Sequence, residues 1–299
     1  RYVEAAGRLG SIAKAAVEVS ISQSSITASI DALEASLDYA LFVRTPAKGI
    51  TPTSAGREAL QLIRTFLNQS QQFESELQSQ GGDDAGLVRI ACYATAAPTF
   101  LPPILKSITE NFPRISVKVM EGNMMAIADY LDNGEVDLVF TYDRHVPHGQ
   151  SFEPLFTAPP YALISRSDEA SQRPSITFEQ LSKKPMIMLD LPYTRDYFFG
   201  LFRARGLEPD VVHSTRSSEI AKALVEGDFG FTLLNIRPRN YSPKDSRYSV
   251  VPISDSSDVP IFGISTTGNL RQPKNVRSFI KICTRLRDDG IFDCCTVTA

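Results

Sequence analysis

Two short amphipathic stretches near the start of the chain restrict its possible folds more than any other feature. Apolar residues recur at helical spacing in both, as Ile12, Ala15, Ala16 and Val19 in the first and as Ile26, Ile30, Leu33 and Leu37 in the second. Residues 19–22 between them are too few for a loop with its own structure, and Ser22 can cap the second helix. The two helices must turn sharply against each other, which the small Ala15 and Ala16 permit. The sequence therefore predicts a helix-turn-helix.

The outward face of the second predicted helix is polar. It carries the side chains of Gln23, Ser24, Ser25, Thr27 and Ser29. Short polar groups of this kind can reach base edges and phosphates in the major groove of DNA. The pattern indicates a DNA-reading domain, and it leaves open a three-helix interaction domain over residues 1–45 that does not contact DNA.

The same segment resembles the N-terminal domain of LysR-type transcriptional regulators. The family's small-residue pair and following Ser-Gln match Ala15, Ala16, Ser22 and Gln23, the start of its wing matches Leu41, Phe42 and Arg44, and its next helix opens like residues 51–56. Ser24 departs from the usual Pro, and Ala28 from a residue that is often polar or basic. Because Arg1 falls inside the family's first helix, we expect a trimmed N-terminus. The resemblance implies a winged helix-turn-helix over residues 1–53 that binds DNA through Ser22, Gln23, Ser24, Ser25, Thr27, Ser29, Arg44, Lys48 and Thr51.

The charge of this segment argues for binding in more than one copy. Through residue 58, the basic residues Arg1, Arg8, Lys14, Arg44, Lys48 and Arg57 are balanced by Glu4, Glu18, Asp31, Glu34, Asp38 and Glu58. Neutralisation of phosphates drives much of protein–DNA affinity, so a single copy should bind weakly. We expect DNA binding to depend on Arg44 and Lys48 at the wing, on helix N-termini and on pairing of copies.

A long helix is predicted over residues 54–80, where no Pro occurs. Its apolar residues alternate in steps of four and three, the spacing of a helix that packs on a partner: Ala59, Ile63, Phe66, Ser70, Phe73 and Leu77. We interpret it as a dimerisation linker helix, with a helix lying on its own domain as the alternative. The glycines and acidic residues of 81–86 then predict a hinge.

From residue 87 onward, strands alternate with helices. Strands are predicted at 87–91, 115–120, 137–141, 186–189, 211–213 and 229–234, and helices at 99–111, 124–133, 195–205 and 220–226. Two successive βαβαβ units imply parallel sheets in two Rossmann-like lobes. The segment 237–258 predicts only a connection followed by a short strand.

The order of these elements is similar to the effector domain of LysR-type regulators, which resembles type 2 periplasmic binding proteins. That resemblance implies an effector-binding domain over residues 87–299. Lobe I would comprise about 87–162 and 264–299, and lobe II about 163–263, with crossings near Tyr161 to Ser165 and near Gly263 to Ser265. The expected fold class is α/β, preceded by an all-α winged helix-turn-helix.

Ligands of open α/β sheets bind beyond the carboxyl ends of the strands, where helix N-termini point into a cleft. This rule selects twelve residues as the effector-binding site: Thr95, Ala96, Asn123, Met124, Thr141, Tyr142, Asp190, Tyr193, Thr194, Arg195, Thr215 and Arg216. Their hydroxyls, N–H groups and Arg195 suit a small anion. The apolar surface of Tyr142, Tyr193, Met124 and Phe198 favours an aromatic or branched organic acid. The alternatives are that Arg195 only pairs with Asp190 or Asp196, that the threonines are helix caps, and that Asp190 binds an amine or a ligand hydroxyl instead of an anion being bound.

Other features of the chain argue against an enzyme and an exported protein. The three histidines, His145, His148 and His213, are scattered, and no phosphate loop, nucleophile elbow or metal motif occurs, so we expect no catalytic residue, cofactor or metal. The four cysteines have no metal spacing, which fits a reducing compartment. Cys92 lies near the expected cleft, where a redox role and a buried thiol are both open. No apolar run approaches a membrane span and no signal peptide is evident, so we expect a cytoplasmic protein.

The sequence thus predicts a sequence-specific DNA-binding transcriptional regulator whose promoter binding or activation depends on a small-molecule effector. Its expected partners are double-stranded promoter DNA, the effector, RNA polymerase and further copies of itself, as a homodimer or homotetramer. The alternatives are a solute-binding module and a helix-turn-helix interaction protein without a role in DNA regulation.

Overall fold

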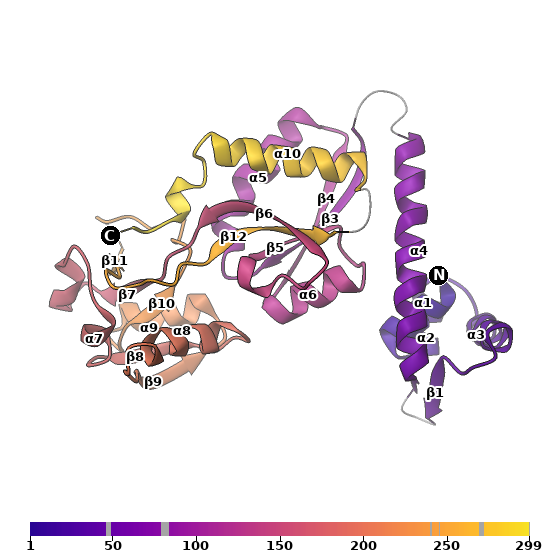
Figure 1. Ribbon diagram of the computed structural model, residues 1–299, viewed down its shortest axis with the longest axis horizontal. Coiled ribbons are helices and arrows are strands. Elements are labelled where there is room, and N and C mark those ends of the chain that lie inside the picture. Colours follow the sequence, from indigo (N-terminus) through magenta and orange to yellow (C-terminus); the bar gives the residue numbers. More distant parts are fainter. Residues whose placement is uncertain (46–48, 79–83, 240, 245, 269–271, 299) are drawn as a thin grey trace. The chain divides into compact units, whose positions relative to one another are not determined.

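The computed structural model describes residues 1–45, 49–78, 84–239, 241–244, 246–268 and 272–298 (Figure 1). An N-terminal unit comprises Arg1–Gln78, and a C-terminal unit comprises most of the remaining chain. Lys48, residues 79–80 of the predicted long helix and residues 81–83 of the predicted hinge lie outside the described residues. Among the described helices, none is both long enough and apolar enough to cross a lipid bilayer.

The N-terminal unit begins with the predicted helix-turn-helix. Its helices are α1 (Tyr2–Leu9), α2 (Ile12–Glu18) and α3 (Gln23–Leu37). Ser11 and Ser22 cap α2 and α3, since each hydroxyl accepts a hydrogen bond from a backbone N–H of the following turn. Ala15, Ala16, Ile26 and Ile30 are buried in a core shared by the three helices. The wing is an antiparallel pair, β1 (Phe42–Thr45) and β2 (Gly49–Pro52).

Helix α4 (Ser54–Gln78) follows the wing, and its apolar residues divide between two environments. Ala59 and Leu60 are buried in the helix-turn-helix core, and Ile63 packs against that core. The predicted contact with a partner helix is therefore wrong for Ala59 and Ile63, which pack on their own domain. Phe66 and Phe73 remain exposed, with 68% and 63% of their surface accessible.

The first lobe of the C-terminal unit contains a five-stranded sheet in the order β4-β3-β5-β12-β6. The strands are β3 (Gly86–Tyr93), β4 (Ile115–Gly122), β5 (Leu138–Tyr142), β6 (Gln150–Thr157) and β12 (Ile261–Thr267). β3 is parallel to β4 and β5, as predicted, but β12 is antiparallel to β5 and β6. β6 was not predicted. It contains Pro154, and it forms the edge of the sheet, where a missing N–H is tolerated.

Helices α5 (Ala97–Asn111) and α10 (Lys274–Asp288) cover one face of this sheet, and α6 (Met124–Asp132) covers the other (Figure 1). The core between α5, α10 and the sheet is aromatic. The Phe100 ring lies 4.8 Å from that of Phe140 and 4.9 Å from that of Phe262, measured between centroids. α10 is an amphipathic helix that the sequence prediction did not include.

The second lobe is built on two small sheets. β7 (Tyr161–Ser165) lies between β10 (Thr232–Leu234) and β11 (Tyr248–Pro252), and both neighbours are antiparallel to it. β8 (Pro185–Leu189) is parallel to β9 (Asp210–Thr215). Helices α7 (Phe178–Leu181), α8 (Thr194–Arg203) and α9 (Ser218–Glu226) complete the lobe.

The predicted strand 229–234 is shorter than expected, and the predicted all-parallel unit is wrong for this strand. Only Phe231 bridges β8 in parallel, whereas Thr232–Leu234 turn to pair antiparallel with β7. The bend lies at Gly230, whose φ of +143° and whose close approach to the Pro185 carbonyl exclude a side chain. The chain therefore leaves the predicted sheet one residue after this glycine.

The chain crosses between the lobes next to the strands rather than within them. The predicted crossing segments Tyr161 to Ser165 and Gly263 to Ser265 lie inside β7 and β12, so the crossings fall at 158–160 and 253–260. The Asn235 amide donates to the Ala158 carbonyl at 2.8 Å, and the Tyr161 hydroxyl donates to the Ile236 carbonyl at 2.8 Å. These bonds join the first crossing to the segment that follows β10.

The start of α4 provides a test of the packing between this helix and the wing. A Cβ atom on Gly56 would lie 1.9 Å from the Leu41 carbonyl oxygen, so Gly56→Ala should lower the free energy of unfolding by about 2 kcal/mol. Gly200→Ala is the matched control, because a Cβ on this helical glycine meets no atom within 4 Å. It should raise stability by about 0.5–1 kcal/mol through reduced chain entropy. Urea unfolding measures both, and equal stability of Gly56→Ala and wild type would contradict the packing.

Candidate functional site

The exposed face of α3 presents the polar residues selected from the sequence. Ser22, Gln23, Ser24 and Ser25 are exposed, and Thr27 and Ser29 are half-buried beside them. The hydroxyls of Thr27 and Ser29 donate to the carbonyls of Gln23 and Ser25, at 3.0 and 2.8 Å. These hydroxyls can therefore only accept further hydrogen bonds, whereas the Gln23 amide can both donate and accept.

Arg44, on β1, is engaged by acidic residues of α3. Its guanidinium forms an ion pair with the Asp31 carboxylate and lies 3.7 Å from a carboxylate oxygen of Glu34. Glu34 also accepts hydrogen bonds from the N–H groups of Leu41 and Phe42, which ties the wing to α3. A phosphate that contacts Arg44 must therefore compete with Asp31. Thr51 is exposed on β2.

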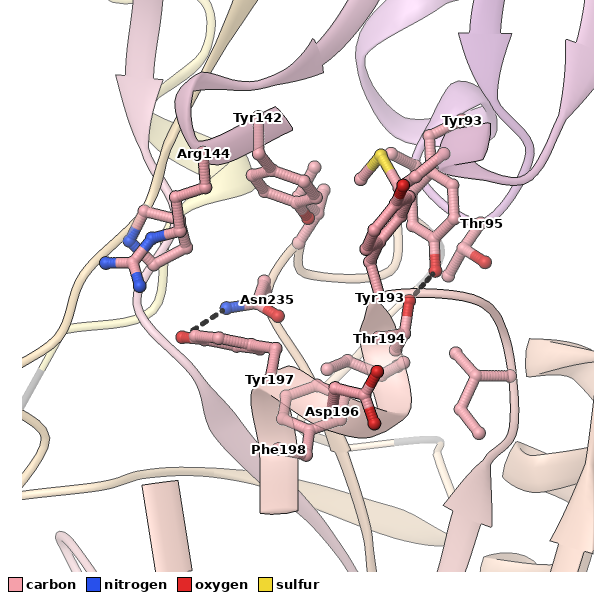
Figure 2. A pocket seen from close by; sticks show the side chains of 16 residues that line it. Tyr93, Thr95, Tyr142, Arg144, Tyr193, Thr194, Asp196, Tyr197, Phe198 and Asn235 are labelled. Atoms are coloured by element: carbon pink, nitrogen blue, oxygen red, sulfur yellow. Dashed lines mark hydrogen bonds between the residues drawn. The ribbon is translucent and has the colours of Figure 1, made fainter. Parts of the chain in front are cut away.

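A cavity of about 250 Å³ lies in the C-terminal unit, with walls from both lobes (Figure 2). Six of the twelve predicted effector-binding residues line it: Thr95, Ala96, Met124, Tyr142, Tyr193 and Thr194. Phe198, expected from the sequence as apolar surface, also lines it. Nine further lining residues were not selected from the sequence: Tyr93, Arg144, Leu189, Asp196, Tyr197, Leu234, Asn235, Ile236 and Pro260.

The other six predicted residues are not part of the pocket lining. The Asn123 side chain caps α6 by accepting from the N–H groups of its first turn, at 3.1 and 3.0 Å. Thr141 is buried and donates to the Met124 sulfur. Arg195 lies 3.4 Å from the Asp190 carboxylate. The remaining two lie at the end of β9, where Thr215 accepts a hydrogen bond from the Ser217 N–H and Arg216 is exposed.

Several polar groups of the pocket are bonded to one another. The hydroxyls of Tyr93 and Thr194 are 2.9 Å apart, which links the end of β3 to the start of α8. The Tyr197 hydroxyl accepts from the Asn235 amide at 3.3 Å and donates to the Asp258 carbonyl at 3.2 Å. Figure 2 shows both side-chain pairs at the pocket wall. Burial raises the pKa of Tyr197 to about 12 and that of Tyr142 well above its usual value, so both hydroxyls stay protonated at neutral pH.

Arg144 is the basic residue of the lining. Its guanidinium contacts both carboxylate oxygens of Asp258 and lies 5.6 Å from the centre of the Tyr197 ring. The hydrogen bonds from Arg144 hold the pKa of Asp258 below its usual value. The guanidinium is therefore neutralised within the protein.

Tyr193 lies at the N-cap of α8 in an unusual backbone conformation. Its φ is +65° and its ψ is −34°, a region that bulky L-residues rarely adopt. Such strain is maintained only where the surrounding structure imposes it. The conformation places the Tyr193 ring at the pocket.

The thiol next to the pocket is inert. Cys92 is fully buried in β3, and burial raises the pKa of its thiol to about 12. Reactive cysteines are accessible thiolates, so the geometry favours the buried-thiol alternative over a redox role. Within the described ranges, no three His, Cys, Asp or Glu side chains lie close enough together to hold a metal ion.

Two family models together match nearly the whole chain. The model described as "Bacterial regulatory helix-turn-helix protein, lysR family" matches residues 1–57, and "LysR substrate binding domain" matches residues 81–287. The chain belongs to the LysR family of transcriptional regulators. The resemblance seen in the sequence is thereby confirmed, as is the fold class.

Individual LysR-family proteins show the same relationship. The HTH-type transcriptional regulator cbl of Escherichia coli is 27% identical over 220 residues, which cover 71% of this chain and 68% of that protein. The HTH-type transcriptional regulator CysB of Burkholderia cenocepacia is 22% identical over 94% of this chain and 89% of its own length.

Solved structures of the family have the same fold. That of HinK, a LysR family transcriptional regulator from Pseudomonas aeruginosa, has a TM-score of 0.63 and 26% identity, and covers 96% of each chain. Full-length CbnR complexed with its target DNA has a TM-score of 0.59 and 20% identity over 96% of this chain and 97% of its own.

The ion pair between Arg44 and Asp31 gives a test of the DNA-binding face of this LysR-family chain. Asp31→Asn should release Arg44 and tighten binding to duplex DNA by up to about five-fold, since surface ion pairs contribute about 0–1 kcal/mol. Asp38→Asn is the matched control. It removes the same charge at the end of α3, where the left-handed conformation also accepts Asn. Fluorescence anisotropy with a labelled mixed-sequence duplex measures both, and equal effects of the two variants would show that Arg44 has no special role.

Proposed function

We propose that this LysR-family transcriptional regulator reads promoter DNA through α3 and the wing, and that a small molecule in the pocket between the lobes modulates its activity. The observation that supports the proposal most directly is a pocket whose lining comes from both lobes. A ligand that contacts both walls stabilises one arrangement of the lobes over others. The effector thereby changes promoter binding or activation by its differential affinity for those arrangements.

The base-reading role is assigned to the N-terminal half of α3. Gln23 is exposed there and carries the amide that adenine recognition commonly uses. Ser22, Ser24, Ser25, Thr27 and Ser29 supply acceptors to bases or phosphates, and Arg44, Lys48 and Thr51 supply the wing contacts. RNA polymerase is proposed as a partner from the regulatory function alone. Access to promoter DNA is the reason for proposing a cytoplasmic location.

A homo-oligomer is proposed because one DNA-binding domain lacks net positive charge and because α4 exposes apolar side chains. Leu62, Phe66 and Phe73 have 72%, 68% and 63% of their surface accessible. They recur at steps of four and seven, so they lie on one side of the helix. A second copy of α4 would cover them, and two helix-turn-helix domains would then bind dyad-related half-sites.

Phe66→Glu tests this pairing. A charge on the apolar side of α4 should weaken self-association by about ten-fold or more, because its burial is unfavourable. Val17→Glu is the control, since Val17 is an exposed apolar residue of α2 with 81% of its surface accessible. Sedimentation equilibrium should show a lower mass only for Phe66→Glu. An unchanged mass would place the oligomer contact elsewhere.

Selection of bound sequences from random duplex DNA tests the proposed function as a whole. The full chain should enrich a dyad-symmetric motif. Gln23→Ala should lose discrimination at one base position of each half-site by about 1–3 kcal/mol. Ser36→Ala, at the other end of α3, should keep the wild-type motif. If no motif is enriched by the wild type, a solute-binding module or an interaction protein becomes the better explanation.

A further inference from the structure

The pocket contains hydrogen-bonding groups that the protein does not use itself. The Asn235 amide nitrogen donates to the Ala158 carbonyl at 2.8 Å and to the Tyr197 hydroxyl at 3.3 Å. A carbonyl oxygen can only accept, so the nitrogen must face Ala158 and the Asn235 Oδ1 atom faces the other way. Figure 2 shows this oxygen directed away from Tyr197. This oxygen can therefore accept a hydrogen bond from a ligand.

The Tyr142 hydroxyl is the second such group. Its ring is held by edge contacts, 6.2 Å from the Tyr93 ring and 5.1 Å from the Phe262 ring. Among the described residues its hydroxyl has no hydrogen-bond partner, whereas the Tyr93 hydroxyl is bonded to Thr194. Burial keeps the Tyr142 hydroxyl protonated. It can therefore accept one hydrogen bond and donate another.

The charges around the cavity disfavour a carboxylate. Arg144 is neutralised by Asp258, and Arg195 lies outside the lining beside Asp190. Asp196 contributes an exposed carboxylate to the lining and lies in the first turn of α8, where it offsets the positive end of that helix. The first turn of α5 contains Pro98, which has no N–H to offer. Among the lining residues, the basic side chain is that of Arg144, which Asp258 already neutralises, so the lining offers an anion no unpaired cation.

The size and walls of the cavity suit one aromatic ring. A cavity of about 150 Å³ lined by apolar groups binds benzene, so about 250 Å³ accommodates a ring with a short substituent. The rings of Tyr93, Tyr142, Tyr193, Tyr197 and Phe198 line it. They provide the edge and face contacts that aromatic ligands prefer.

We propose that the pocket takes a single-ring aromatic alcohol or amine that lacks a carboxylate. The ligand donates a hydrogen bond to Asn235 Oδ1 and forms a second one, as donor or acceptor, with the Tyr142 hydroxyl. A protonated amine is in addition attracted by the Asp196 carboxylate. This assignment rests on the proposed function of the pocket as the effector site. It replaces the organic or aromatic acid expected from the sequence.

Three ring compounds with matched tails test the proposal: tyrosol is uncharged, tyramine is a cation and 4-hydroxyphenylacetate is an anion. Titration calorimetry with the full chain at neutral pH should show tyrosol or tyramine bound about ten-fold or more tightly than the acid. Tighter or equal binding of the acid overturns the proposal. So does the absence of binding by all three at millimolar concentration.

Variants locate the binding groups. Tyr142→Phe keeps the ring and removes the hydroxyl, and should weaken binding of tyrosol or tyramine about ten-fold. Tyr130→Phe makes the same change in the same lobe outside the lining, and should leave the affinity unchanged. Asp196→Asn should weaken tyramine more than tyrosol. Equal affinity of Tyr142→Phe and wild type would remove this hydroxyl from the site and overturn the assignment.

The selection of DNA sequences separates failure of this inference from failure of the proposed function. An enriched motif together with absent or acid-preferring ligand binding rejects the ligand class and leaves the regulator intact. A compound that binds as proposed confirms the ligand chemistry whatever its effect on DNA. If it leaves the affinity for the selected DNA unchanged, an effect on promoter binding is rejected and only an effect on activation is left.

Discussion

The pocket depends on two hydrogen bonds that tie the first crossing between the lobes to the segment that follows β10. The Asn235 amide bonds to Ala158 and the Tyr161 hydroxyl bonds to Ile236, and both side chains are buried. Breaking such a bond leaves a buried polar group unpaired, at a cost of about 1–3 kcal/mol. The first crossing is thereby restrained. Asn235 takes part in this restraint and lines the cavity, so the proposed ligand contact and the restraint at the crossing lie on one side chain.

Local periodicity explains what could be predicted from the sequence. The helix-turn-helix, α4 and the strands β3 to β5 follow from apolar spacing and from caps such as Ser22, because these depend on neighbours in the chain. β6 and the antiparallel place of β12 could not be predicted, because they depend on pairing with strands more than a hundred residues apart in sequence. Pro154 is compatible with β6 because this strand forms the edge of the sheet, where a missing N–H is tolerated.

The rule that ligands lie beyond strand ends selected twelve residues, and six of them line the pocket. It found Thr95, two residues after β3, and Tyr142, the last residue of β5. It missed Tyr197, which lies one turn into α8, and Asn235, which lies near a crossing. Tyr197 could have been predicted from the sequence, because it lies one helical turn after Thr194 and on the same side of the helix. The position of Asn235 could not be predicted, because it depends on a hydrogen bond to the distant Ala158.

The pairing of Arg44 with Asp31 has a consequence for the response to ionic conditions. Phosphate contacts made by free cations release condensed counterions, which makes DNA affinity fall steeply as salt rises. Where a guanidinium already has a carboxylate partner, salt weakens that pair as well as the phosphate contact, and the two effects partly cancel. We therefore expect the DNA affinity of a domain with this ion pair to fall less steeply with rising salt than that of a domain whose guanidinium is unpaired.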